Sequence, residues 1–136
     1  MVDNAQETLG GAGDSPDLAE LTRRLLAFRD ARDWAQFHTV KNLMVSLALE
    51  ASELLEVAQW KTDEQLDAAI VGPGADPVLR RRLEEECADV LLYLLLLAER
   101  TGIDLARAAA AKIELNDARY PVAKARGNSL KYNELE

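Results

Sequence analysis

Two pairs of acidic residues lie on stretches that are otherwise apolar and helical in pattern. Glu50 and Glu53 fall inside the stretch 39–61, which contains neither proline nor glycine. Glu86 and Asp89 come just before a second long apolar run. Residues three apart lie one above the other on a helix, so each pair projects from a single face. Carboxylates on helices that are covered by protein need a partner.

We expect the two helices to pack antiparallel, which would let the four acids meet. Four carboxylates brought together without a cation would repel one another and raise one another's pKa. Oxygen ligands alone, with no histidine on either pair, favour a hard divalent cation, Mg²⁺ or Mn²⁺. One such pair would be better explained by solvated acids near a helix end. The occurrence of two pairs on apolar helices favours a metal site.

An aromatic segment is a candidate for holding a nucleobase. Trp34, Phe37 and His38 lie within five residues in a chain that is only 5% aromatic. The helical stripe that passes through His38 continues along the next helix to Trp60. These side chains could form a flat-sided pocket next to the acids, and a hydrophobic plug between helices is the alternative interpretation.

Positive charge comes from the stretch 104–119. Lys112, Asn116 and Arg119 share one helical stripe, on the side that should bury apolar surface. Snorkelling around a core is one explanation, and a face that receives phosphate oxygens is the other. A metal held by carboxylates beside a basic strip is what hydrolysis of a phosphoanhydride requires.

Composition limits the classes of protein that the chain can belong to. The 136 residues suffice for one domain with a core, and the net charge of −8 argues against binding a nucleic-acid polymer. Cys87 is the only cysteine, which favours a reducing compartment, and its helical position predicts a small core residue. Residues 1–16 lack the layout of a signal peptide, and the apolar run 90–98 is too short to span a bilayer. We therefore expect a cytoplasmic protein that does not enter membranes.

The pattern predicts an all-α domain over residues 17–136 after a loose tail over 1–16. Ser15 is the expected N-cap of the first helix, and Gly102 is the expected C-terminal stop of the third. A capping box formed by Thr62 and Gln65 predicts a short helix after the second. A polar C-terminal segment, about 122–136, follows the last helix. The four main helices are expected at about 17–33, 39–61, 77–101 and 104–119.

The order of these residues resembles one known family. The motifs are the aromatic segment that ends in Gln-Phe-His38, the two acidic pairs, Lys112-x-x-x-Asn116, Arg119-Tyr-Pro121 and the late Lys131-Tyr132. Together they resemble the all-α nucleoside triphosphate pyrophosphohydrolase superfamily, the MazG-like group, and within it the dCTP pyrophosphatase branch. The resemblance covers roughly residues 18–135.

The resemblance implies a four-helix MazG-like bundle completed by oligomerisation, as a homodimer or homotetramer. It implies Mg²⁺-dependent hydrolysis of a nucleoside triphosphate to the monophosphate and pyrophosphate, with dCTP or a modified dCTP first. Glu50, Glu53, Glu86 and Asp89 would be the catalytic metal ligands. The implied substrate-binding residues are Trp34, Phe37, His38, Trp60 and Tyr93 around base and sugar, Lys112, Asn116 and Arg119 at the phosphates, and Lys131 and Tyr132 closing the site.

Two alternatives to this activity remain open at the level of sequence. One is a helical nucleotide-binding or dimerisation module that does not hydrolyse its ligand, which metal-dependent release of pyrophosphate would exclude. The other is a dUTPase-like or phosphoribosyl-ATP pyrophosphatase of the same superfamily. A ferritin-like di-iron bundle is disfavoured because its Glu-x-x-His pairs are missing.

Overall fold

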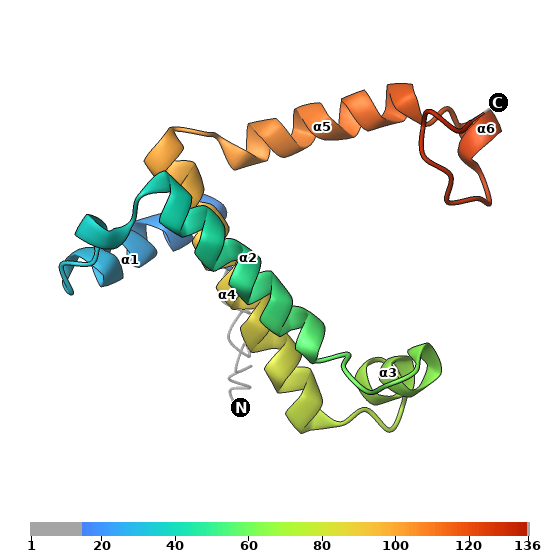
Figure 1. Cartoon of the computed structure of the whole chain (residues 1–136), viewed down its shortest axis with the longest axis horizontal. Helices are drawn as coiled ribbons and strands as arrows, with labels where there is room; N and C mark the ends of the chain where they lie inside the picture. The colour runs from blue at the N-terminus through green and yellow to red at the C-terminus, as the bar shows by residue number, and fades with distance from the viewer. Residues whose placement is uncertain (1–14, 136) are drawn as a thin grey trace, which may run out of the picture.

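The computed structural model describes residues 15–135 and confirms the all-α fold class, since this part of the chain contains only helices and their connections. Residues 1–14 of the predicted tail, which was expected over 1–16, lie outside the described residues. The elements are α1 (Leu18–Asp30), a short 3₁₀-helix η1 (Ala35–Phe37), α2 (Val40–Glu56), α3 (Asp63–Ile70), α4 (Pro77–Thr101), α5 (Leu105–Arg119) and α6 (Val122–Ala125) (Figure 1).

Most helix ends follow the capping residues that the sequence offers. The Thr62–Gln65 capping box is present at the start of α3, and Gly102 ends α4 in the left-handed conformation with φ 71°. The expected cap at Ser15 is wrong. The N-cap of α1 is Asp17, whose carboxylate accepts the backbone N–H of Glu20 at 2.8 Å.

The second helix is shorter than expected, because α2 ends at Glu56 and not near Lys61. Its last turn tightens, with backbone bonds from Ala58 N to Leu55 O at 3.0 Å and from Lys61 N to Ala58 O at 3.2 Å. Trp60 then adopts φ 65°. This turn is needed because Thr62 must be extended, with ψ 166°, to cap α3. Trp60 is therefore displaced from the stripe on which the sequence pattern placed it.

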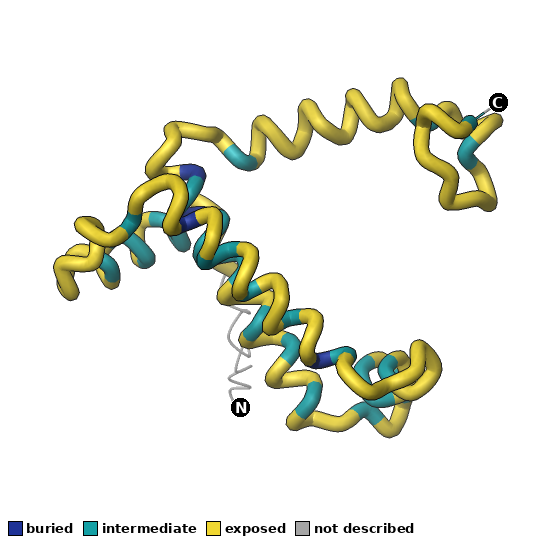
Figure 2. Tube along the Cα trace, in the orientation of Figure 1, coloured by how far each residue is buried: buried dark blue, intermediate teal, exposed yellow. Residues whose placement is uncertain are grey.

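Helices α2 and α4 pack side by side and antiparallel, and α4 also contacts α1 near one end and α3 near the other (Figure 1). The buried core of this arrangement is small and gathers along these contacts (Figure 2). Cys87, expected in the core, is exposed. The buried apolar residues are Leu43, Val57, Leu95, Leu96 and Ala98.

The fourth main helix, α5, extends away from the other helices (Figure 1). Leu105 at its start is half-buried, and its remaining residues are exposed (Figure 2). The expected four-helix bundle is therefore not complete within one chain. Apolar residues on α2 are exposed as well, among them Met44, Leu49 and Leu55.

Candidate metal and nucleotide site

The antiparallel packing of α2 on α4 brings three of the four predicted acids together. Carboxylate oxygens of Glu50, Glu86 and Asp89 all lie within 4.8 Å of one another. Glu50 and Glu86 are half-buried, and Asp89 is exposed. Glu53 lies one turn further along α2, is exposed, and is not among the three acids in this group.

The electrostatics of this acidic cluster fit a bound cation. Burial raises the pKa of Glu50 above its ordinary value, and the charges of Glu53, Asp89 and Glu86 raise it further. One oxygen of Glu86, Oε2, is buried and has no hydrogen-bonding partner among the described residues. A buried acceptor without a donor is destabilising. A hard divalent cation would satisfy that oxygen and offset the repulsion, and oxygen ligands are the ones such cations prefer.

A pocket of about 400 Å³ lies between the aromatic segment and helices α2 and α4. Four of the residues predicted to contact base or sugar line it, namely Trp34, Phe37, His38 and Tyr93. Tyr93 lies on α4 one turn after Asp89, so the pocket and the acidic cluster are neighbours on one helix. The other lining residues are Asn42, Leu43, Val45 and Ser46.

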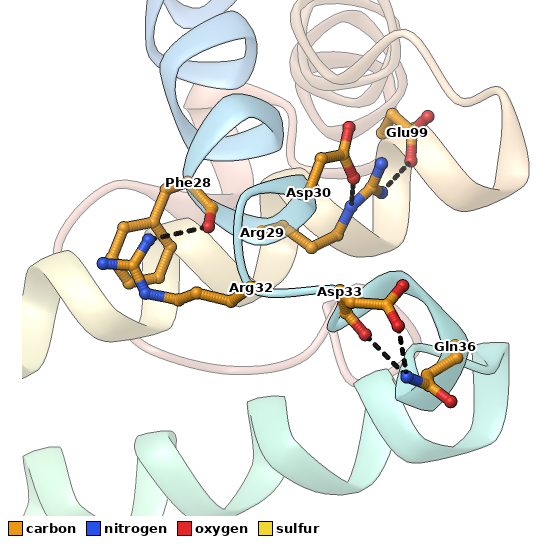
Figure 3. Close-up of polar contacts among 7 residues, drawn as sticks. All are labelled: Phe28, Arg29, Asp30, Arg32, Asp33, Gln36 and Glu99. Atoms are coloured by element: carbon orange, nitrogen blue, oxygen red, sulfur yellow. Dashed lines mark hydrogen bonds and ion pairs between the residues drawn. The ribbon is translucent and has the colours of Figure 1, made fainter.

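The aromatic segment is held by polar contacts (Figure 3). Asp33, with φ 53°, begins the turn. Gln36 Nε2 donates to both the backbone oxygen and Oδ2 of Asp33, each at 2.9 Å. At the other end, Asn42 Nδ2 donates to Phe37 O at 3.0 Å. These bonds fix the wall of the pocket.

Arg32 and the ring of Phe28 pack against the same aromatic segment. The guanidinium of Arg32 lies 3.7 Å from the ring centroid of Phe28 and donates to Phe28 O at 2.9 Å. Phe28 packs edge-on against Trp34, with 5.7 Å between ring centroids. The sequence pattern identified Trp34 as a site residue, whereas it assigned no role in the site to Arg32, Gln36 or Asn42. The Asx and helix-capping contacts that involve them are local, so turn chemistry around Asp33 and Thr39 was the available signal.

Other predicted site residues lie apart from the acidic cluster in this chain. Trp60 is 92% exposed and does not line the pocket. Lys112, Asn116 and Arg119 are exposed on α5, which leads away from α2 and α4 (Figure 1).

Lys131 and Tyr132 lie at the far end of α5, where the C-terminal segment folds back. The Arg119 guanidinium lies 4.8 Å from the Tyr132 ring centroid, and Tyr120 packs edge-on against the same ring at 6.2 Å. Lys131 N donates to Glu134 Oε2 at 3.0 Å. The basic and C-terminal residues thus form a unit of their own, separate from the acids within one chain.

The fold and the site define a class of all-α proteins in which two antiparallel helices carry an acidic cluster beside an aromatic pocket. Residues 45–135 match the MazG-like family, and the chain belongs to that family. The matched region begins downstream of the aromatic segment and includes both acidic pairs.

Relatives within this class are similar over most of the chain. Human dCTP pyrophosphatase 1 is 44% identical over 121 residues, which cover 88% of this chain and 68% of that protein. The bovine protein of the same name is 40% identical over 145 residues, covering 96% of this chain and 83% of its own length. The crystal structure of a pyrophosphatase from Archaeoglobus fulgidus superposes with a TM-score of 0.65 at 38% identity, covering 82% of this chain and 99% of that one.

None of the helices in residues 15–135 combines the length and apolar character needed to cross a membrane.

Proposed function

We propose that this chain hydrolyses a nucleoside triphosphate to the monophosphate and pyrophosphate, with dCTP or a modified dCTP as substrate and Mg²⁺ as cofactor. The observation that carries the proposal is the cluster of Glu50, Glu86 and Asp89 within 4.8 Å, next to the aromatic pocket. The names of the relatives, dCTP pyrophosphatase 1, support the substrate. Such an enzyme would act on the nucleotide pool of the cytoplasm.

The residues that would hold Mg²⁺ are Glu50, Glu86 and Asp89, with Glu53 completing the set of carboxylates. When bound, the cation supplies charge neutralisation at the triphosphate and makes water more acidic. Half-burial of Glu50 and Glu86 strengthens their attraction for a cation relative to fully solvated carboxylates. Glu53, being exposed, remains free to approach the substrate side of the cluster or a water.

The pocket beside the cluster would take the base and sugar. Aromatic side chains such as Trp34 and Phe37 stack on any base without choosing among bases. Choice requires hydrogen bonds, and the lining offers the amide oxygen of Asn42 and the hydroxyl of Ser46 as acceptors. These acceptors suit the exocyclic amino group of cytosine. Tyr93 lies between pocket and acids along α4, where it would touch the sugar.

A second copy of the chain would supply the phosphate contacts. Lys112, Asn116 and Arg119 lie on α5, which extends away from α2 and α4, the helices that carry the acidic cluster (Figure 1). We place them, with Lys131, Tyr132 and the C-terminal segment, at the triphosphate of a neighbouring copy in a homodimer or homotetramer. The exposed apolar residues of α2 support this assembly.

Incubation with a panel of dNTPs, including 5-modified cytosines and dUTP, tests the activity. We expect pyrophosphate and monophosphate in equal amounts, fastest from a cytosine nucleotide, and loss of turnover when EDTA removes the metal. Absence of pyrophosphate from every nucleotide would contradict hydrolysis. Binding of nucleotide without turnover would instead favour a binding module, and a preference for dUTP would favour the dUTPase-like alternative.

Glu53→Gln tests the metal set, because it removes one negative charge with little change in volume. We expect turnover to fall by about tenfold to a hundredfold, since the fourth carboxylate is lost, while the helical circular dichroism stays unchanged. Glu84→Gln on α4 is the matched control, because Glu84 is exposed and its carboxylate pairs with Arg80 at 3.4 Å, outside the group of three acids. Full activity of Glu53→Gln would show that Glu53 is not part of the metal site.

A further inference from the structure

A second cavity adjoins the aromatic pocket lined by Trp34, Phe37, His38 and Tyr93, which is called the nucleotide pocket below. It measures about 410 Å³, and Arg29, Glu99 and Arg100 are among its lining residues. His38 and Leu43 line both this cavity and the nucleotide pocket. The imidazole of His38 is therefore part of the partition between the two spaces, with substrate expected on one side and charged side chains on the other.

Arg29 connects three parts of the chain around this cavity (Figure 3). Its Nε donates to Asp30 Oδ1 at 2.7 Å, and its Nη1 donates to Glu99 Oε2 on α4 at 3.3 Å. Its backbone oxygen accepts the N–H of Trp34 at 3.2 Å. The Arg29 side chain is only 15% exposed, so these contacts are partly shielded from water.

The charge of Arg29 also acts on His38. Burial lowers the pKa of His38 below its ordinary value of 6.5, and the positive charge of Arg29 lowers it further. The other titratable or charged groups that face His38 are Glu99 and Arg100 in the rear cavity and Tyr93 in the pocket. Nδ1 of His38 is buried without a hydrogen-bonding partner among the described residues. A neutral imidazole offers one N–H and one lone pair, whereas a protonated one has no acceptor.

We propose that Arg29 is a positioning residue for nucleobase recognition: bound to Glu99, it fixes the segment from Trp34 to His38 against α4 and holds a positive charge behind the His38 imidazole. This inference deepens the proposed function and assumes that the pocket takes the base. Arg29 itself does not line that pocket. Its charge adds to the effect of burial in keeping His38 neutral, and its contacts hold His38 in place, so that the ring can either donate to the base or, as the other tautomer, accept from it.

The titration of His38 tests the electrostatic half of this inference without any nucleotide. His38 is the only histidine of the sequence, so the imidazole signal in an NMR titration is unambiguous. We expect Arg29→Met to titrate at higher pH than the wild type, because one cation is lost, while Arg29→Lys stays close to the wild type. Arg23→Met is the matched control: Arg23 lies on the same helix, pairs with Glu20 and is 71% exposed.

Steady-state kinetics test the positional half. We expect Arg29→Met to raise KM by about fivefold to tenfold with kcat within about twofold, because base binding and not the reacting phosphate is disturbed. The acid limb of kcat/KM should move to higher pH with the His38 titration. Arg29→Lys, which keeps the charge but loses the fork that reaches Asp30 and Glu99 together, should raise KM without moving that limb.

The titration and the kinetics together distinguish a failure of this inference from a failure of the proposed function. An unchanged His38 titration in a folded Arg29→Met variant, or a KM equal to that of Arg23→Met, overturns the role of Arg29 even if hydrolysis is normal. Conversely, a wild type that releases no pyrophosphate overturns the proposed function, while the titration still reports the coupling between Arg29 and His38.

Discussion

Glu86 carries a buried carboxylate oxygen that has no hydrogen-bonding partner within residues 15–135, and burial together with neighbouring acids raises the pKa of Glu50 beside it. Both features lower the stability of the metal-free protein, because charged groups are partly desolvated and face like charges. Such an arrangement is expected where function requires the repulsion, as at a cation site. Stability and metal binding should therefore oppose each other at these residues.

Glu50→Gln should stabilise the metal-free protein and abolish its response to Mg²⁺. With the pKa of Glu50 raised in the folded state, the folded protein holds this proton more tightly than the unfolded one, so stability falls as pH rises through that pKa. Glutamine removes this loss, and because the site is half-exposed we expect a rise in Tm on the order of 2 °C near neutral pH.

Thermal unfolding with and without Mg²⁺ measures both effects for Glu50→Gln. The wild type should gain Tm with Mg²⁺, because ligands that bind only the folded state stabilise it. Glu84→Gln should behave like the wild type in this assay. An equal Mg²⁺-dependent gain in Glu50→Gln would show that the cation binds without this carboxylate.

At the scale of elements, capping residues and hydrophobic period predict most of the fold. Gly102 ends α4 as predicted, and Asp76 and Asp104 cap the starts of α4 and α5 within the expected ranges 77–101 and 104–119, since caps act on the nearest turn. The end of α2 could not be predicted in this way. Its helical period continues past Glu56, and the turn at Trp60 is imposed by the start of α3. Period alone also cannot say which apolar face is covered, so Cys87 was placed in the core wrongly.

In the site too, features set by local sequence could be predicted, whereas contacts between residues far apart in the sequence could not. The juxtaposition of Glu50 with Glu86 and Asp89 could be predicted, because each acid lies on an apolar helix and antiparallel packing of the two helices lets the acids meet. The contact between Arg29 and Glu99 joins residues 70 positions apart, and no local sequence pattern predicts it. Such contacts depend on the crossing of α1 over α4, which the periodicity of either helix leaves undetermined.

Trp60 offers a prediction at this scale, because a bulky side chain with φ 65° is strained. Trp60→Gly should raise the free energy of unfolding by about 0.5–1 kcal/mol, since glycine adopts this conformation without a steric penalty, offset by its larger unfolded-state entropy. The same variant should lose activity if the ring contacts substrate in the assembly. Chemical denaturation and the dNTP assay measure the two effects.

Trp60→Ala is the control for this pair of effects, because alanine removes the ring but retains a β-carbon. It should lose activity to the same extent without gaining stability. A fully active Trp60→Gly enzyme would exclude Trp60 from the substrate site. The Trp60 ring, which is 92% exposed, would then be a surface side chain without a role in binding.

At the scale of the whole molecule, the isolated chain leaves too much apolar surface uncovered. A helix of 15 residues such as α5 is marginal in water without tertiary contacts. It nevertheless exposes apolar side chains such as Ile113, at 66%. The residues that we propose to bind phosphate, Lys112, Asn116 and Arg119, lie on this same helix, which extends away from α2 and α4 (Figure 1). Assembly would cover the apolar surface and complete the site in one step.

Mixing two inactive variants tests whether the site is shared between copies. Glu50→Gln lacks an acid on α2, and Lys112→Ala lacks a cation on α5, so each alone should be nearly inactive. If α5 serves the neighbouring copy, a mixed dimer pairs the intact acids of one chain with the intact Lys112 of the other. Random pairing makes half of the dimers mixed, each with one of two sites intact, so co-expression should restore about a quarter of wild-type activity.

Mass measurement in solution should show a dimer or tetramer for both variants and for the co-expressed mixture. If Lys112 reached the acids of its own chain, every mixed dimer would carry two defective sites and activity would stay at the level of the single variants. That outcome would contradict the shared site, whereas recovery near a quarter requires it. Ile113→Glu should then lower both the assembled fraction and turnover, because a charge on the covered face of α5 opposes the association that completes the site.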